Sequence, residues 1–289
     1  MKLKTLLPIL ISSFLPLQTF AVTDHSHNLT SISDEDVAHQ RANLAKNTQG
    51  RGFGPQSPRD IDLIEGRNTI SFSLAPAYSS MNLCNIHFHK NAEHKGGEFT
   101  IFAGNGNGLG YDTGFKFSGS LSAAELAAIN QDICPSEHGG LRPGDTIEVH
   151  YVHSSAKTIP GPSLGACLND SVRNPQLRVE AQVYVLVNDH NALDFRELTK
   201  LGEHKGFHQA VNIPANTGLP IQYPGSTTGP GYNEQGSPFQ VTWSVRPRVA
   251  KVNIKSVDNW CRENVFNEDH AHGVRNLITN PDLLSGVNP

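Results

Sequence analysis

The sequence predicts a mainly β protein with a few short helices. Glycine (26) and proline (18) are plentiful among the 289 residues, which favours a loop-rich β architecture over a helical bundle. Residues 178–187 carry valine or alanine at every second position from Val179 to Val187, the pattern of a strand with one buried face. Similar short runs, separated by turn residues, continue to about residue 257.

The first 21 residues have the pattern of a secretory signal peptide. Lys2 and Lys4 precede an apolar run from Leu6 to about Leu17, and Ala21 offers the small residue expected at a cleavage site. A membrane anchor is the alternative, but prolines and serines interrupt the run, which is too short to span a bilayer comfortably. We expect cleavage after Ala21 and a periplasmic or secreted protein whose mature form is not in a membrane.

Charge excludes some partners. The signal segment contains two lysines and no acid, so its removal changes the formal net charge from −4 to −6. An acidic chain does not indicate nucleic acid or an anionic membrane surface as a partner. The oligomeric state stays open, and a homodimer is possible.

Helices are expected at three places. The polar segment 22–51 should contain one that begins near Ser33 with an acidic first turn and ends at about Lys46. A second is expected over residues 123–129, capped by Ser120 or Ser122, and a weaker pattern covers residues 192–201.

Seven strands are expected from the alternation of side chains and from turn signals. They cover residues 69–74, 85–89, 98–103, 146–153, 176–187, 239–245 and 250–254. No linker between residues 52 and 289 is rich enough in polar or flexible residues to divide the chain, so we expect one domain there.

Two histidine motifs predict a metal site. His87 and His89 are separated by one residue on an expected strand, so both side chains project from the same face. His150, on another expected strand, supplies a third imidazole. Three imidazoles with an open fourth position are the ligand set of a catalytic zinc, which lowers the pKa of its bound water to roughly 7.

Neighbouring residues strengthen the choice of ligands. Glu148 and Asn85 each stand two residues before a ligand, and a metal-bound imidazole usually gives its other N–H to a carboxylate or carbonyl. His94 is the other candidate for the third metal ligand and is closer in sequence to His87 and His89 than His150 is. It follows a turn, however, so we prefer His150 as the third ligand. His153 falls on the opposite strand face, which predicts a structural hydrogen-bonding role.

Cysteines suggest disulfides. An even number in an exported chain favours two bridges and leaves three pairings open, and no CxxC spacing supports a thiolate metal site. One bridge is nevertheless favoured over two, because Cys84 lies next to the expected metal-binding strand and could be free. The four residues are Cys84, Cys134, Cys167 and Cys261.

Two other motifs have simple explanations. The glycine-rich run 104–110 lacks the Lys-Ser/Thr ending and the following helix of a phosphate-binding loop, which favours a flexible connection. The run Ser226–Thr228 is not part of a GxSxG motif, which favours hydrogen bonding over a nucleophilic role.

Five segments, in order along the chain, resemble carbonic anhydrases. Alpha-class enzymes have similar QSPxxI, YPGSLTTPP and VTW segments, while the surroundings of residues 85–93 and the long stretch before Glu148 look more like the delta class. The chain is thus similar to a bacterial-type delta-class carbonic anhydrase with alpha-like architecture, over about residues 52–260. The segments are Gln56–Ile61, His87–His94, Glu148–His153, Tyr223–Thr228 and Val241–Trp243.

This resemblance implies a fold and an activity. It implies a twisted, mostly antiparallel central sheet with short surface helices, and one catalytic domain over residues 52–289. It also implies Zn2+ bound by the three histidines, and reversible hydration of CO2 to bicarbonate and a proton.

The resemblance further implies roles for pocket residues. Thr228 would accept the proton of zinc-bound hydroxide and donate its own to Glu93, with Thr227 as the neighbouring candidate for this position. Val152, Val241 and Trp243, with Thr227, would line the apolar pocket that holds CO2. The chain departs from the alpha pattern at Thr227 and Gly229, and no histidine clearly matches the alpha-class proton shuttle.

Two alternatives remain. In a cupin, iron or manganese would be bound by the same three histidines and directly by Glu93, but residues 56–61 and 223–228 would then be unexplained. A noncatalytic zinc-binding module on the same fold is the other alternative, since fold alone never settles function.

Overall fold

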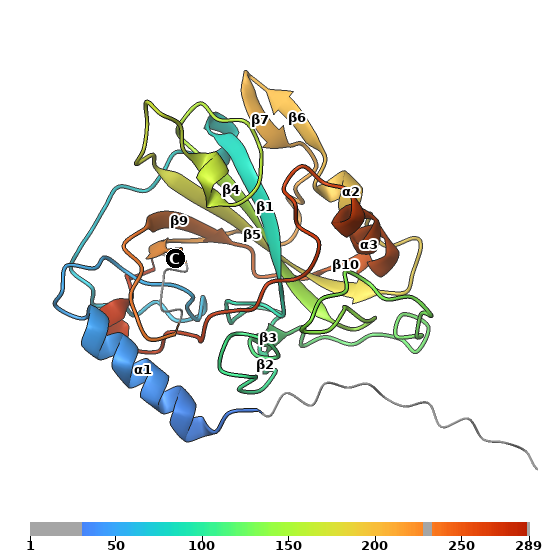
Figure 1. The fold of residues 1–289 in the computed structure, drawn as a ribbon, viewed down its shortest axis with the longest axis horizontal. Coiled ribbons are helices and arrows are strands. Elements are labelled where there is room, and N and C mark those ends of the chain that lie inside the picture. Colours follow the sequence, from blue (N-terminus) through green and yellow to red (C-terminus); the bar gives the residue numbers. More distant parts are fainter. Residues whose placement is uncertain (1–30, 228–232, 288–289) are drawn as a thin grey trace, which may run out of the picture.

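A central β-sheet dominates the computed structural model, which describes residues 31–227 and 233–287. The strand order is β1-β4-β5-β9-β8, and β10 pairs with β5 beyond the end of β9 (Figure 1). β1/β4, β4/β5 and β8/β9 are antiparallel, whereas β9 and β10 run parallel to β5. The mainly β fold with few helices is therefore confirmed, and the sheet is mixed. Its strands are β1 (Asn82–Lys90), β4 (Thr146–Ser154), β5 (Leu177–Val187), β8 (Ile221–Ser226), β9 (Gln240–Val245) and β10 (Ala250–Asn253).

Smaller elements surround the sheet. Two hairpins pair β2 (Ile101–Phe102) with β3 (Phe115–Lys116) and β6 (Leu201–His204) with β7 (Phe207–Ala210). The α-helices are α1 (Asp34–Thr48), α2 (Phe195–Leu198) and α3 (Ile254–Arg262), and short 3-10 turns cover Tyr78–Ser80, Leu164–Cys167 and Pro281–Leu283. No helix in the described part of the chain has the length and apolar composition needed to cross a membrane. The signal segment 1–21 and its cleavage after Ala21 lie outside the described residues.

Strand alternation divides the sheet into two faces. On β1 and β4, Phe88 and Val149 enter one apolar core, which also contains Phe195 and Trp260. The residues that alternate with them face a second core, formed by residues such as Val152 of β4 and Trp243 of β9. Because side chains alternate with period two, all residues of the expected metal site on β1 and β4 share the second face.

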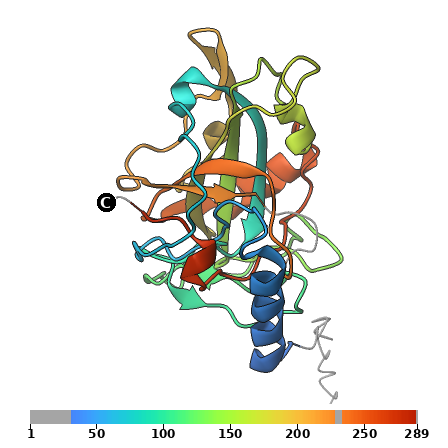
Figure 2. The same cartoon turned by 90° about the vertical axis from the view of Figure 1, so that its left-hand side faces the viewer.

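The first helix follows its sequence signals. Ser33 caps α1 and forms a reciprocal capping box with Asp36, which satisfies two backbone donors at the helix start. α1 packs on loops beside the sheet (Figure 2), through bonds such as Gln40 Nε2 to the Gly108 carbonyl and Arg41 Nε to the Leu277 carbonyl.

Several expected elements are wrong or shortened. Residues 123–129 form no helix, residues 69–74 form no strand, and the expected strand 98–103 is reduced to β2. The weak helix over 192–201 is only the four-residue α2. We did not expect β8, the β6/β7 hairpin or α3 from the sequence.

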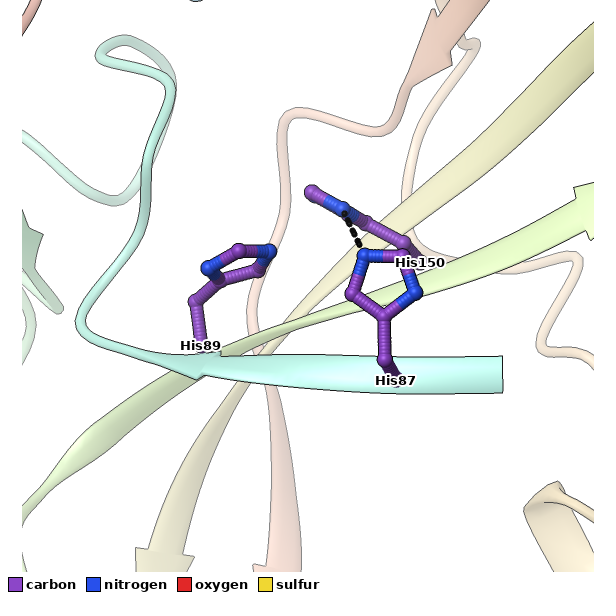
Figure 3. Close-up of side chains that lie close together, drawn as sticks. All are labelled: His87, His89 and His150. Atoms are coloured by element: carbon purple, nitrogen blue, oxygen red, sulfur yellow. Dashed lines mark hydrogen bonds between the residues drawn. The ribbon is translucent and has the colours of Figure 1, made fainter. Parts of the chain in front are cut away.

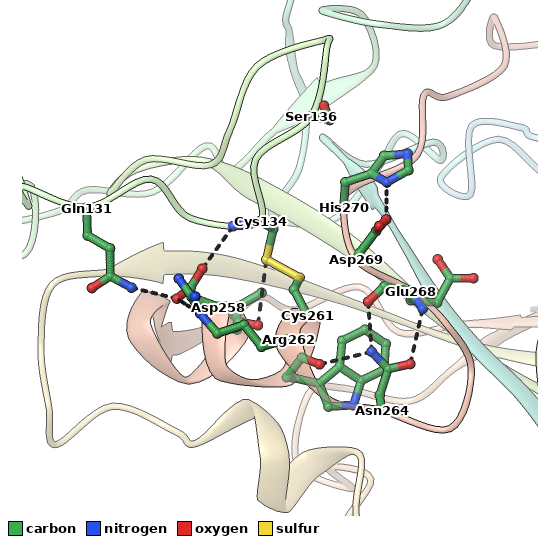
Figure 4. Close-up of a disulfide and its surroundings, with 12 residues drawn as sticks. Gln131, Cys134, Ser136, Asp258, Cys261, Arg262, Asn264, Glu268, Asp269 and His270 are labelled. Atoms are coloured by element: carbon green, nitrogen blue, oxygen red, sulfur yellow. Dashed lines mark hydrogen bonds and ion pairs between the residues drawn. A yellow bond between two sulfur atoms is a disulfide. The ribbon is translucent and has the colours of Figure 1, made fainter.

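Both pairs of cysteines form disulfides. Cys84 is bonded to Cys167, and Cys134 to Cys261, so the expectation of one bridge with Cys84 free is wrong. Figure 4 shows the second bridge, which ties the segment around Cys134 to α3. Asp258 of α3 supports the same junction by accepting from the backbone N–H of Cys134 and from Gln131 Nε2.

Candidate metal centre

Three histidines converge on the second face of the sheet. His87 on β1 lies directly opposite His150 on β4, and His89 lies opposite Glu148. Figure 3 shows the three imidazoles of His87, His89 and His150 turned toward one another. One ring nitrogen from each lies within 4.8 Å of those from the other two, and His150 Nδ1 is 3.2 Å from His87 Nε2.

Each ring is oriented through its other nitrogen. His87 Nδ1 bonds Asn85 Oδ1 at 2.7 Å, His150 Nε2 bonds Glu148 Oε1 at 2.9 Å, and His89 Nδ1 bonds the Gly273 carbonyl at 2.8 Å. All three acceptors take an N–H, which leaves the lone pairs of His87 Nε2, His89 Nε2 and His150 Nδ1 facing the centre. No sequence pattern could have predicted the role of Gly273, because any residue type provides a backbone carbonyl.

This donor set fits a zinc ion. Two nitrogens at 2.0–2.1 Å from a tetrahedral zinc lie roughly 3.3 Å apart, close to the 3.2 Å between His150 Nδ1 and His87 Nε2. Burial and the neighbouring imidazoles lower the pKa values of His87 and His89 well below their usual value. Both side chains are therefore neutral at pH 7, the form that binds metal.

Glu148 is fully buried and accepts four hydrogen bonds. Oε2 accepts from the backbone N–H groups of Glu93 (2.7 Å) and His94 (3.0 Å), and Oε1 accepts from the rings of His94 (2.6 Å) and His150 (2.9 Å). Burial alone would raise the pKa of this carboxyl, but His94 and His150 outweigh it and hold the pKa well below its usual value. The side chain is therefore a carboxylate.

The other two histidines of these motifs are engaged elsewhere. His94 has no exposed surface, and its ring nitrogens bond Glu148 Oε1 and the Tyr223 hydroxyl, each at 2.6 Å. Glu93, His94 and His150 also form a close group, but both nitrogens of His94 already have partners. His153 points to the other face, where its Nδ1 bonds the Tyr151 carbonyl and burial lowers its pKa to about 3.

A cavity of about 520 Å³ opens beside the three histidines. Its apolar wall includes Val152, Val179 and Trp243, and Thr227 and Glu93 also line it. The Thr227 hydroxyl is buried and has no hydrogen-bond partner among the described residues. Thr228 lies outside the described residues.

Val241 and Glu93 differ from Val152 and Trp243, which form part of the apolar wall of the cavity. Val241 is buried in the same core as Trp243, but it is not among the described residues that line the cavity. Glu93 is almost completely buried, and its Oε1 accepts from the Arg275 backbone N–H at 3.2 Å.

The sequence did not predict one wall of the cavity. Phe266, Glu268, His272 and Gly273 line it from the polar C-terminal segment. His272 Nε2 bonds Glu268 Oε2 at 2.6 Å, and its ring centroid lies 5.8 Å from those of both His87 and His89. The His270-x-His272 spacing was the only available signal, and no strand periodicity surrounded it.

Fold and site together define a β-sheet protein with a candidate three-histidine metal centre that lines a cavity. A family model described as delta carbonic anhydrase matches residues 78–256, which is more than half of the chain. The chain therefore belongs to the delta carbonic anhydrase family. This assignment decides against the cupin alternative.

Other comparisons add little. A search of curated proteins finds no match. Among solved structures, the chain is similar to an alpha-carbonic anhydrase from Thermovibrio ammonificans in complex with sulfanilamide (14% identity, 79% of this chain and 84% of that chain, TM-score 0.28). It is also similar to the alpha-carbonic anhydrase of Photobacterium profundum (16%, 85% and 95%, 0.27) and to Cah3 from Chlamydomonas reinhardtii in complex with acetazolamide (17%, 80% and 88%, 0.30). At such low identities and TM-scores, these likenesses carry no weight for the assignment.

Proposed function

We propose that this chain catalyses the reversible hydration of CO2 to bicarbonate and a proton at a zinc ion bound by His87, His89 and His150. The observation that carries the proposal is the convergence of three imidazole lone pairs, each ring being fixed through its other nitrogen. Zinc in such a site lowers the pKa of a bound water to roughly 7, which makes hydroxide available at neutral pH.

The surrounding groups would preserve the geometry of the site. Asn85 Oδ1, the Gly273 carbonyl and Glu148 Oε1 hold the three rings in one tautomer each. Such partners typically raise metal affinity or activity 10–100-fold. We therefore assign Asn85 and Glu148 the orienting roles expected from the sequence and add the backbone of Gly273.

A hydroxyl beside the site would direct the reaction. We assign Thr228 to accept a proton from the reacting oxygen and to donate its own to Glu93. Support comes from Glu93, whose buried carboxylate lines the cavity. Thr227 competes for this role, because its buried hydroxyl lines the same cavity and has no partner among the described residues.

The apolar wall would hold CO2. Val152, Val179 and Trp243 form a surface that offers CO2 contact without hydrogen bonds and keeps water from that side of the site. Val241 packs within the core that includes Trp243, so its contribution would be to position that ring.

We also propose that the mature protein is exported, with a signal peptide over residues 1–21 and a helical segment 22–51 before one catalytic domain, 52–289. Two disulfides support an oxidising compartment. The partners would be CO2 and bicarbonate.

The test is stopped-flow CO2 hydration, with zinc content measured on the same purified protein. One zinc per chain with fast hydration is expected, and His150→Ala should lose both. Thr228→Val should keep zinc and lose most of the rate, and a loss from Thr227→Val instead would transfer the role to Thr227. Zinc-loaded protein without hydration would overturn the proposal.

A further inference from the structure

One side of the cavity is joined covalently to the strand that supplies two of the candidate metal ligands. Residues 162–166 lie in the connection between β4 and β5, and the first three of them line the cavity; we call these five residues the clamped segment. Cys167, which follows directly, is bonded to Cys84 of β1. Both cysteines are fully buried in the second core. The disulfide therefore links β1 to a segment that shapes the cavity.

The clamped segment is attached to β1 on both sides. Before it, the Gly161 N–H donates to the Cys84 carbonyl at 3.0 Å, and Asn85 Nδ2 donates to the Gly161 carbonyl at 3.1 Å. After it, the disulfide holds Cys167. The hydrogen bonds described for the segment itself all have both partners within the same loop. Its position relative to the sheet therefore depends on these two attachments and on side-chain packing.

Ser163 has a backbone conformation that is unfavourable for its residue type. Its φ of 56° and ψ of 173° lie in a region that is essentially restricted to glycine, and such a conformation persists only when the surrounding structure enforces it. The two attachments provide this enforcement, because they fix the chain on either side of Ser163. If the disulfide were removed, the second end would keep only the weaker link of a hydrogen bond from Ser154 Oγ to the Cys167 carbonyl (2.7 Å) among the described contacts.

Leu164 is the side chain that the attachments hold beside the apolar wall. Val152, Val179 and Trp243 form one row across three strands, because Val152 pairs with Val179 and Val179 with Trp243. Leu164 is half-buried, packs against the same core and lines the same cavity. The binding of an apolar molecule such as CO2 depends on how completely apolar side chains surround it. Leu164 adds a contact surface from outside the sheet, which the row of strand residues cannot provide.

We propose that Cys84 and Cys167 are positioning residues for the substrate. Their bond holds Leu164 beside the row of Val152, Val179 and Trp243, and the apolar site for CO2 is complete only while that bond is formed. This rests on the proposed CO2 hydration. The bond acts on KM through Leu164 and leaves the zinc and its three histidines in place.

Stopped-flow CO2 hydration over a range of CO2 concentrations separates KM from kcat. The double variant Cys84→Ala, Cys167→Ala should raise KM about fourfold, the equivalent of one lost CH2 contact, with kcat and zinc content unchanged. Leu164→Ala should raise KM by a similar factor. The triple variant should resemble either of them, because both changes remove the same contact. An unchanged KM, or two effects that multiply in the triple variant, would overturn the proposal.

Two controls match these variants. Cys134→Ala with Cys261→Ala removes the other bridge, which lies in the first core, so it should lower stability and leave KM unchanged. Leu168→Ala removes an exposed leucine of the same loop that is not among the described residues lining the cavity, and it should also leave KM unchanged. An equal rise in KM with either control would show that general loosening, and not the position of Leu164, sets KM, which would refute the positioning role.

Quenching of Trp243 fluorescence by acrylamide tests the position of the clamped segment without any hydration activity. Trp243 is 3% exposed, and a Trp260→Phe background leaves it as the only tryptophan of the chain. Loss of the Cys84–Cys167 bond should raise the quenching constant about twofold, because local opening exposes the ring, whereas loss of the other bridge should not. Unchanged quenching would overturn the proposal even in a protein that hydrates CO2. Raised quenching in a protein without hydration would support the position of Leu164 and refute the proposed function, so the two failures are distinguishable.

Reduction provides a second route to the same state if the variant without Cys84 and Cys167 does not fold. In the folded Cys134→Ala, Cys261→Ala protein, the Cys84–Cys167 bond is the remaining disulfide. A water-soluble phosphine opens it, taking up oxygen from water while the two sulfurs become thiols. KM and Trp243 quenching should then rise as they do in the alanine variant, and no change in either after complete reduction would refute the proposal.

Discussion

Replacing the Glu148 carboxylate by an amide should weaken metal binding strongly. Glu148→Gln keeps the shape of the side chain, but one end becomes an NH2 group, which can only donate. All four groups that contact Glu148 are donors in the arrangement described above. In either orientation of the amide, its NH2 group therefore faces two of these donors and cannot accept a hydrogen bond from them.

The two orientations have different costs. If the NH2 group faces the backbone N–H groups of Glu93 and His94, two buried donors lose their acceptor, which costs about 1–3 kcal/mol each. If it faces the two imidazoles, they can shift their protons instead, and His150 then carries its proton on Nδ1, the nitrogen proposed to bind the metal. Because a tautomer shift avoids stranding two buried groups, we expect the second orientation.

The expected result is a loss of zinc affinity of about 10–100-fold, or roughly 1.4–2.7 kcal/mol, with a smaller change in unfolding free energy. Competition with a chelator measures the affinity, and urea denaturation of the metal-free protein measures stability.

Glu180→Gln is the matched control. Glu180 is 3% exposed and accepts from Arg178 Nε at 2.6 Å and from Ser244 Oγ at 2.8 Å. Its replacement should lower stability and leave zinc affinity unchanged. Zinc affinity of Glu148→Gln within threefold of wild type would refute the argument.

Two other predictions concern stability. The disulfides close loops with separations of 83 and 127 residues, and the loss of chain entropy in the unfolded state corresponds to a stabilisation of about 4.5 and 5 kcal/mol, respectively. The double variant Cys134→Ala, Cys261→Ala should therefore lower the unfolding free energy measured in urea by several kcal/mol. A loss below about 1 kcal/mol would contradict this expectation. Burial lowers the pKa of His153 to about 3. Its contribution to the unfolding free energy is therefore fully present above pH 6.5 and declines as the pH falls toward 3. The reason is that in this range the unfolded chain binds a proton at His153, whereas the folded chain does not. Stability should drop by about 2 kcal/mol between pH 7 and 5 from this residue, and His153→Phe should show a correspondingly flatter pH profile; an unchanged profile would argue against the assignment.

Local patterns determined much of the site. In a strand, side chains alternate with period two, so His87-x-His89 and Glu148-x-His150 each had to share a face. The observed register of β1 and β4 then placed the two pairs opposite each other. α1 was equally predictable, because its capping box lies within four consecutive residues.

Local sequence patterns gave wrong predictions of secondary structure where tertiary packing determines whether an element forms. Residues 123–129 have good helix formers, and Ser122 and Glu125 do form a capping turn. The carbonyls of Glu125 and Ala127, however, accept from the backbone and side chain of Asn188, and the alanines are exposed. A short helix is stable only when a face is buried against a neighbour, and this segment has no such face.

The sequence by itself determined five strands of the central sheet (β1, β4, β5, β9 and β10), the three histidines and two of their partners, because each depends on residues a few positions apart. Only the tertiary structure decided the pairing of the cysteines, the Gly273 carbonyl behind His89, the C-terminal wall of the cavity and the contact of His94 with Tyr223. These features join segments separated by 83 to 184 residues, and no periodicity in the chain encodes which distant segments will meet.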